Sequence, residues 1–181
     1  MTLTIKLGAT ALALVLAAGT ATAQSFDWTG FSGGLQIGTI DVDTDGPDLS
    51  GNDESFGARA YYDVDYGDFV VGGGIQYDET DVDLDGAATI DSVLRIGGRA
   101  GYDLDRNWIY AAAGYAQAMT DAGSVDVGDS GGFYLGVGYE VFLTNEITAG
   151  AELLYHQFED FDVDGLEADA TTFSLSVNYR F

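Results

Sequence analysis

Hydrophobic and polar residues alternate with a period of two along most of the chain. The final segment shows this best, since one face carries Phe173, Leu175, Val177, Tyr179 and Phe181, with polar residues between them. Successive side chains of a strand point to opposite faces, so the period predicts β-strands with one apolar and one polar face. No apolar run after residue 23 is long enough for a membrane helix.

This period recurs in segments of about 9–11 residues, which is the length that a tilted membrane-spanning strand needs. We expect eight of them, at 29–39, 54–63, 68–77, 90–102, 108–119, 131–142, 146–158 and 170–181. Three short connections (64–67, 104–107 and 143–145) alternate with four longer ones (40–53, 78–89, 120–130 and 159–169). That alternation is typical of outer-membrane barrels. The sequence predicts an all-β fold: a closed up-and-down antiparallel transmembrane β-barrel of eight strands.

The charged residues inside these segments lie on the polar face. A soluble barrel of the lipocalin type would instead bury its large apolar residues and show polar ones to water. A closed barrel with a polar lumen and an apolar face toward lipid places every one of these charges favourably. The residues predicted to face the lumen are Arg59, Arg95, Arg99, Glu140, Glu152 and Arg180. The facing of the fifth segment, 108–119, is ambiguous.

Aromatic residues gather near the predicted strand ends, where amphipathic rings favour the membrane–water boundary. We expect them on the outer face at the two boundaries. They are Trp28, Phe31, Tyr66, Phe69, Tyr102, Trp108, Tyr139, Phe142, Tyr155, Phe158 and Tyr179.

The first residues indicate export. Residues 1–6 carry one positive charge, 7–18 are apolar, and Ala21-Thr22-Ala23 offers the small residues that a signal peptidase needs. We expect a cleaved signal peptide at 1–23 and a barrel at 24–181. Without cysteine there is no disulfide framework and no lipid-anchored cysteine.

With these features the chain resembles the small eight-stranded outer-membrane barrel families, of the opacity-porin and outer-membrane protein A transmembrane-domain type. The pattern Leu175-x-Val177-x-Tyr179-x-Phe181 is similar to the terminal aromatic signal of that family. The resemblance implies that Tyr179 and Phe181 form an assembly signal read by the barrel-assembly machinery. It also implies the outer membrane of a Gram-negative bacterium, with an even strand count placing both termini in the periplasm.

The lumen of an eight-stranded barrel is filled by side chains. We expect two ion-pair layers in it, one near mid-height with Arg59, Arg95 and Glu152 and one toward the periplasmic end with Arg99, Arg180 and Glu140. Buried charges must be paired or hydrated, because an unpaired one costs several kcal/mol. A structural plug is the expected role, and a small gated channel is the alternative.

Negative charge concentrates in the longer connections. Of the 30 acidic residues, 21 fall in segments 41–54, 78–91, 121–129 and 159–169, and none of these segments contains Lys or Arg. The formal charge of −24 becomes −25 once Lys6 leaves with the signal peptide. We therefore expect an anionic outer surface that attracts cations or basic groups and does not bind nucleic acid.

Two acidic segments repeat the pattern D-x-D-x-D-G. Alternate carboxylates before a glycine turn can converge on calcium. The position of the bidentate glutamate is Asn52 in one segment and Ser92 in the other, so solvated acidic loops are expected and weak calcium binding is the alternative. Calorimetry with calcium would distinguish them. The candidate ligands are Asp41, Asp43, Asp45, Asp81, Asp83 and Asp85.

No catalytic arrangement is readable. Outer-membrane lipid A deacylases of similar size use a His-x-Ser pair, whereas Phe158 follows His156 at that spacing. We expect no enzyme, no cofactor and no resident metal. Two classes of function stay open. One is a monomeric structural or surface-interaction barrel in contact with outer-membrane lipid and lipopolysaccharide. The other is a porin for small solutes or hydrophobic molecules.

Overall fold

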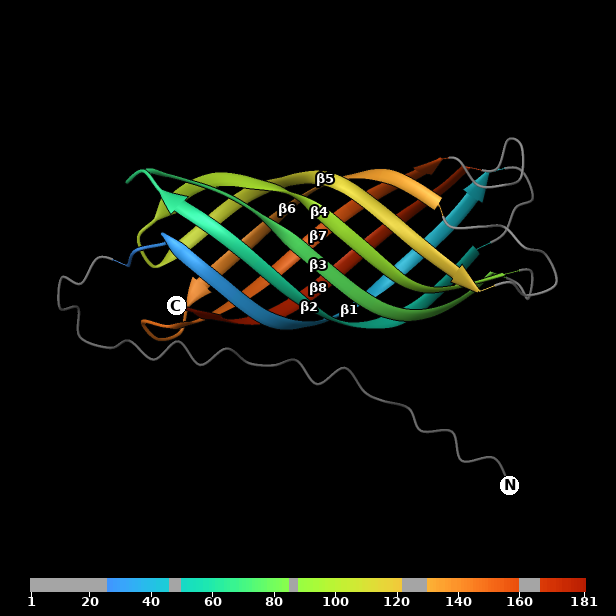
Figure 1. The fold of residues 1–181 in the computed structure, drawn as a ribbon, viewed down its shortest axis with the longest axis horizontal. Coiled ribbons are helices and arrows are strands. Elements are labelled where there is room, and N and C mark those ends of the chain that lie inside the picture. Colours follow the sequence, from blue (N-terminus) through green and yellow to red (C-terminus); the bar gives the residue numbers. More distant parts are fainter. Residues whose placement is uncertain (1–25, 46–49, 85–87, 122–129, 160–166) are drawn as a thin grey trace, which may run out of the picture.

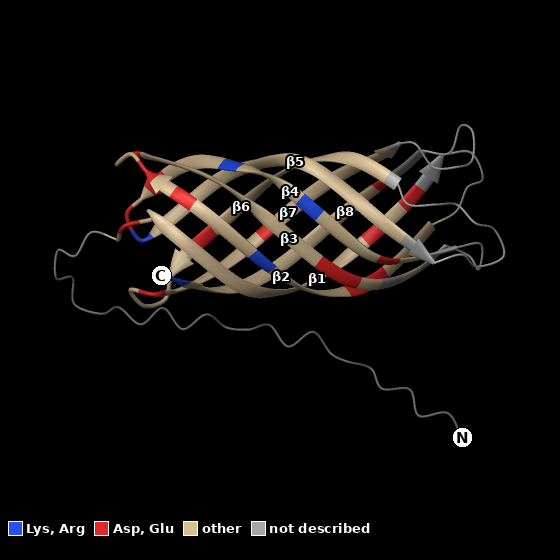
Figure 2. Ribbon diagram, viewed as in Figure 1, with Lys and Arg blue, Asp and Glu red and all other residues tan. Residues whose placement is uncertain are grey.

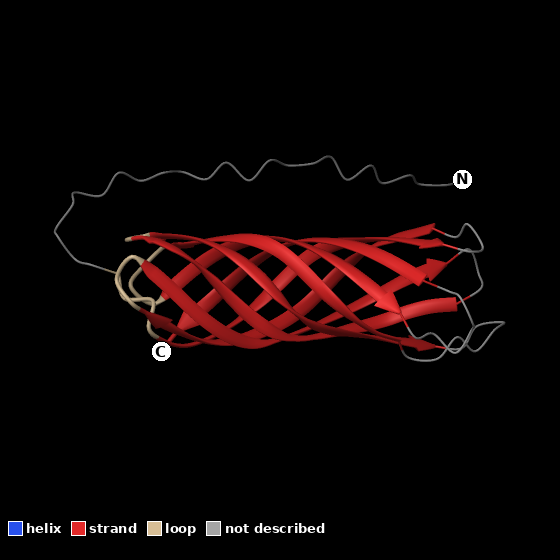
Figure 3. Ribbon diagram, turned by 90° about the horizontal axis from the view of Figure 1, so that it is seen from above, coloured by secondary structure: helices blue, strands red, loops and turns tan. Residues whose placement is uncertain are grey.

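The chain forms one closed antiparallel β-barrel, as the alternation predicts. The computed structural model describes residues 26–45, 50–84, 88–121, 130–159 and 167–181. Each strand pairs with its neighbour in sequence, and β1 pairs with β8 to close the tube (Figures 1 and 3). The strands are β1 (Gly30–Asp45), β2 (Ser50–Asp65), β3 (Phe69–Leu84), β4 (Ala88–Leu104), β5 (Asn107–Asp121), β6 (Ser130–Phe142), β7 (Ile147–Glu159) and β8 (Glu167–Arg180). Among these residues no helix is long and apolar enough to cross a membrane.

The two ends of the barrel differ in their connections. The chain enters β1 and leaves β8 at the same end as the three short turns, and we call this the inner end (Figure 1). Gly67, with φ of 96°, sits in the β2–β3 turn, and Asp105, with φ of 65°, sits in the β4–β5 turn. Both residue types tolerate the left-handed conformation that such tight turns require. The opposite end is called the outer end.

Alternation decides which side chains enter the barrel. In β8, Phe173, Leu175 and Val177 are exposed on the outer wall, and the residues between them are buried in the lumen. The facing of β5 is now settled, because Trp108, Tyr110 and the alanines in step with them point inward. The outer wall is therefore an apolar belt around a filled interior.

The prediction that all the end-of-strand aromatics face lipid was wrong for four of them. Trp28, Trp108, Phe142 and Phe158 are at most 2% exposed and lie inside the barrel. At these positions a large ring on the inward side fills the end of the lumen and removes its own apolar surface from water. The other seven are exposed. Tyr66 lies in the β2–β3 turn, and six lie on the outer wall: Phe31, Phe69, Tyr102, Tyr139, Tyr155 and Tyr179.

The strands run further toward the outer end than predicted. Pairing of β1 with β2 continues to Asp43 and Ser50, and pairing of β3 with β4 continues to Leu84 and Ala88. Much of the first two predicted long connections is thus strand. The pattern D-x-D is itself a period of two, with Val42 and Val82 buried on the inward side. Sixteen residues at about 3.3 Å each extend some 50 Å, more than a tilted strand needs to cross a membrane.

One seam in the wall is incomplete. Pairing of β2 with β3 runs from Asp65 and Val70 to Phe56 and Glu79 and stops there. Beyond it, among the described residues, 50–55 pair only with β1, and the outer residues of β3 pair with β4 after a register shift between Glu79 and Val82. Such a bulge ends regular pairing and bends the strand. The described parts of β2 and β3 therefore separate at the outer end.

Candidate functional site

The lumen holds all six residues that the alternation assigns to it. Their exposed fractions run from 1% for Arg95 and Glu140 to 6% for Arg180. Figure 2 shows arginine and acidic segments together from the inner end to the middle of the barrel, and acidic segments without arginine toward the outer end. These charges form three groups along the axis, where the sequence predicted two layers.

The group nearest the inner end is a closed cluster of two arginines and two acids. Asp63 accepts from Arg99 through both oxygens, at 2.9 and 2.7 Å, and from Arg180 at 3.1 Å. Glu140 accepts from Arg99 at 3.0 Å and from the Thr148 hydroxyl at 2.6 Å. The charges balance, and such bidentate charge-assisted bonds are the strong ones.

The middle group surrounds one carboxylate. Glu152 accepts hydrogen bonds from Gln76 at 2.7 Å and from the Tyr110 hydroxyl at 2.9 Å. Arg59 forms the ion pair, at 3.4 Å from Glu152, and also donates to Ser176 at 3.3 Å. The carboxylate is thus held by donors from three different strands.

The third group lies toward the outer end and is built on Arg95. Its guanidinium pairs with Asp78, which also accepts from Gln36 at 2.7 and 2.8 Å. Arg95 Nε donates to His156 Nε2 at 2.7 Å. The ring proton of His156 therefore sits on Nδ1, which is 3.2 Å from the Ala170 carbonyl. His156 is fully buried and its ring stacks on Phe158. Both ring nitrogens therefore have their hydrogen-bond partners inside the barrel.

Two acids of this network were not predicted. Asp63 stands at the end of the second expected strand, and Asp78 was assigned to an outward connection. Each lies an even number of positions from a lumen residue of the same strand, Asp63 from Arg59 and Asp78 from Gln76, and so points to the same side. That parity was the signal that could have found them. The pairing of Arg95 with Asp78 in place of Glu152 is the reason that one predicted layer divides in two.

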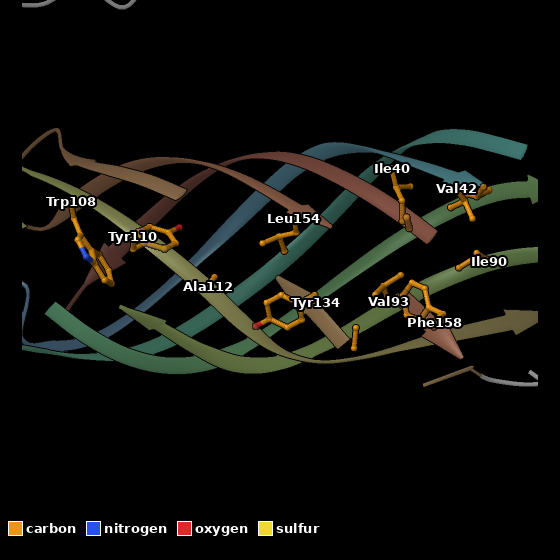
Figure 4. Close-up of a cluster of buried hydrophobic side chains, with 14 of the residues drawn as sticks. Ile40, Val42, Ile90, Val93, Trp108, Tyr110, Ala112, Tyr134, Leu154 and Phe158 are labelled. Carbon is orange, nitrogen blue, oxygen red and sulfur yellow. The ribbon is translucent and has the colours of Figure 1, made fainter. Parts of the chain in front are cut away.

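Apolar side chains close the lumen on both sides of the charges (Figure 4). At the inner end the Trp28 ring lies 4.3 Å from Phe142 and 5.4 Å from Trp108 between ring centroids. The Trp28 indole donates to Asp103 and to the Asp105 carbonyl, both at 3.1 Å. The outer layer contains Ile40, Val42, Val82, Ile90, Val93 and Phe158.

The predicted calcium ligands do not form a described site. Asp41 and Asp43 lie exposed on the outward side of β1. Asp45, Asp81 and Asp83 belong to strands, but their side chains are outside the described part, as is Asp85 altogether. Among the described residues no three His, Cys, Asp or Glu side chains group so as to hold a metal. Weak calcium binding stays a prediction.

Two other predictions concern the ends of the chain. Tyr179 and Phe181 lie exposed on the outer wall, with ring centroids 4.9 Å apart, and Phe181 also contacts Phe31. Their role as an assembly signal stays a prediction. The signal peptide expected at 1–23 lies outside the described residues.

Comparison with known proteins places this barrel. Neisserial surface protein A has a similar structure, with a TM-score of 0.62 and 17% identity over 84% of this chain and 98% of that one. The attachment invasion locus protein of Yersinia pestis has a TM-score of 0.50 and 14% identity, over 84% of this chain and 99% of that one. No curated protein sequence matches significantly. The model of the outer membrane protein beta-barrel domain matches residues 9–181, so the chain belongs to this family of outer-membrane barrels.

Proposed function

We propose that this protein is a non-conducting barrel with a structural and surface-interaction role, which presents an acidic outer end to cationic groups. The observation that carries the proposal is the filled lumen. Three charged groups lie between two apolar layers, and the side chains of each ion pair are at most 5% exposed. A permeant solute would have to displace buried, paired charges, which is costly.

The acidic outer end supports the interaction role. Exposed carboxylates on the outer parts of the strands include Asp41, Asp43, Glu54 and Glu79. Segments 41–54 and 78–91, which contain them, have no Lys or Arg. Such a surface attracts cations, basic peptides and divalent ions that bridge neighbouring lipopolysaccharide. This assignment places both termini and the short turns in the periplasm.

Transport of small solutes or hydrophobic molecules is the alternative. Pairing between β2 and β3 ends near the outer end of the wall. On the inner-end side of this seam, Asp78 accepts hydrogen bonds from both Gln36 and Arg95 across the lumen. The seam therefore supports a side pocket better than a passage through the barrel.

Single-channel recording in planar bilayers tests the proposal. We expect no steady openings for the native barrel, because each group in the lumen is packed and paired. The Glu152→Ala variant removes the carboxylate that Arg59 and Tyr110 contact. Steady openings of the native protein whose conductance changes in this variant would overturn the non-conducting role.

A further inference from the structure

The seam between the outer ends of β2 and β3 carries a hollow of about 560 Å³. Residues from β1, β2, β3 and β8 line it, with apolar side chains mainly from β1 and β8 and acidic side chains from β2 and β3. The hollow thus connects the outer wall with the polar lumen near the outer end. It lies at the one place where pairing between described neighbouring strands stops early.

One part of the hollow is apolar. Its lining includes Ile37, Phe56, Phe173 and Leu175, all between 44% and 59% exposed on the outer wall. Unpaired strand edges are tolerated only where water or another polar group reaches them, so the seam belongs at the boundary of the bilayer. An alkyl chain of an outer-leaflet molecule can lie along this apolar side.

The rest of the lining is polar and negative. It includes Asp53, Glu54 and Glu79, and the exposed side chains of Glu54 and Glu79 lie on the same outward face as Phe56. None of the described lining residues is Lys or Arg. Ser55 and Thr80 also line it, each only 7% exposed, and neither hydroxyl oxygen has a hydrogen-bond partner among the described residues. Buried polar atoms are nearly always paired, so these two hydroxyls are suited to pair with a polar group of a molecule in the hollow.

We propose that this hollow binds one membrane amphiphile that has a single alkyl chain and a primary ammonium head. An ammonium group has three donors and no acceptor. It can donate to the Ser55 and Thr80 hydroxyls while the three carboxylates balance its charge. A quaternary ammonium has the charge but no donors, and an anionic head is repelled. This site goes beyond the proposed surface role and does not depend on whether the lumen conducts.

Titration calorimetry of the barrel in phosphatidylcholine nanodiscs, with empty nanodiscs subtracted, tests the site. Dodecylamine should show one saturable site per barrel. Dodecyltrimethylammonium keeps the charge but lacks N–H donors, and butylamine keeps the ammonium but lacks the long chain. We expect the affinity of each to be at least about tenfold lower than that of dodecylamine. Dodecyl sulfate should show no site. Equal binding of the three dodecyl amphiphiles would overturn the proposal, since it would mean non-specific partition.

Matched variants then locate the site. Ser55→Ala with Thr80→Val removes both hydroxyls at nearly constant volume, and Asp53→Asn with Glu79→Gln removes two charges. Each pair should weaken dodecylamine binding about five- to tenfold. Ser32→Ala, near the inner end, and Asp43→Asn, outside the hollow, should leave it unchanged.

A heat-modifiable shift on unboiled gels checks the folding of every variant. If either double variant fails to fold, the single exposed change Glu79→Gln gives the reading, with about threefold weaker binding expected. Unchanged affinity in the folded seam variants would overturn the proposal. Conductance of the native barrel would instead overturn the non-conducting role and leave the site intact.

Discussion

The inner and outer ends of the barrel are built on opposite principles. At the inner end, Asp63 and Glu140 neutralise Arg99 and Arg180, and packed aromatic rings cover the network on that side. At the outer end, the carboxylates of the seam hollow have no Lys or Arg among them. Charges are buried where partners surround them and left toward water where partners are lacking. We therefore expect the inner end to contribute more to stability than the outer end, in line with the surface-interaction role proposed for the outer end.

Loss of packing at the inner end should give the largest single decrease in stability. Trp28→Ala should lower the free energy of unfolding by about 5 kcal/mol, because it opens a cavity among two rings and loses two indole hydrogen bonds. Phe158→Ala, at the outer end, removes a ring that stacks on His156. It should cost about 3 kcal/mol. Urea unfolding in lipid vesicles measures both, and equal losses would contradict the proposed asymmetry.

Single carboxylates should separate the ends next. Asp63→Asn leaves Arg99 and Arg180 short of a buried counter-charge, so we expect a loss of about 4 kcal/mol. Asp53→Asn, the matched change at the outer end, should alter the free energy of unfolding by less than about 0.5 kcal/mol. The same urea titration compares them. A large loss in Asp53→Asn would reveal a cationic partner for the outer carboxylate, beyond the Glu54 backbone N–H that already donates to it at 2.6 Å.

A single hydroxyl should give the smallest effect. Tyr110→Phe removes one of three side chains that donate to Glu152, and Gln76 and Arg59 remain. We expect a loss of about 1 kcal/mol. Tyr62→Phe, on the exposed outer wall, is the control and should cost nothing measurable. A loss in Tyr110→Phe as large as that in Asp63→Asn would mean that the middle group is as important as the inner one.

Much of the fold could be predicted because its signal is local. The period of two gave eight strands, and the parity of Arg59 and Arg95 placed them inside. The outer strand ends were missed because Asp41-Val42-Asp43 looks like an acidic loop, although its alternation is that of a strand with Val42 inward. Composition suggested a loop there, and pairing with β2 decided otherwise.

The candidate site was less predictable than the fold. Parity shows that Phe158 faces inward, but not that its ring stacks on His156. Likewise, parity could place Asp78 in the lumen, but only the structure shows that it takes Arg95 as partner. The seam hollow had no local signal, because Ser55 and Thr80 are ordinary strand residues whose lack of partners depends on the register of three strands.

The sequence by itself therefore determined the strands, their two faces and the excess of negative charge toward the outer end, since each depends on residues close together in the chain. Only the tertiary structure decided which side chains contact each other across the lumen. Asp63 accepts a hydrogen bond from Arg180, which is 117 positions away in the sequence, and Trp28 donates one to Asp103, which is 75 positions away. Those contacts follow from the closure and stagger of the barrel, which set the height of each strand against the others.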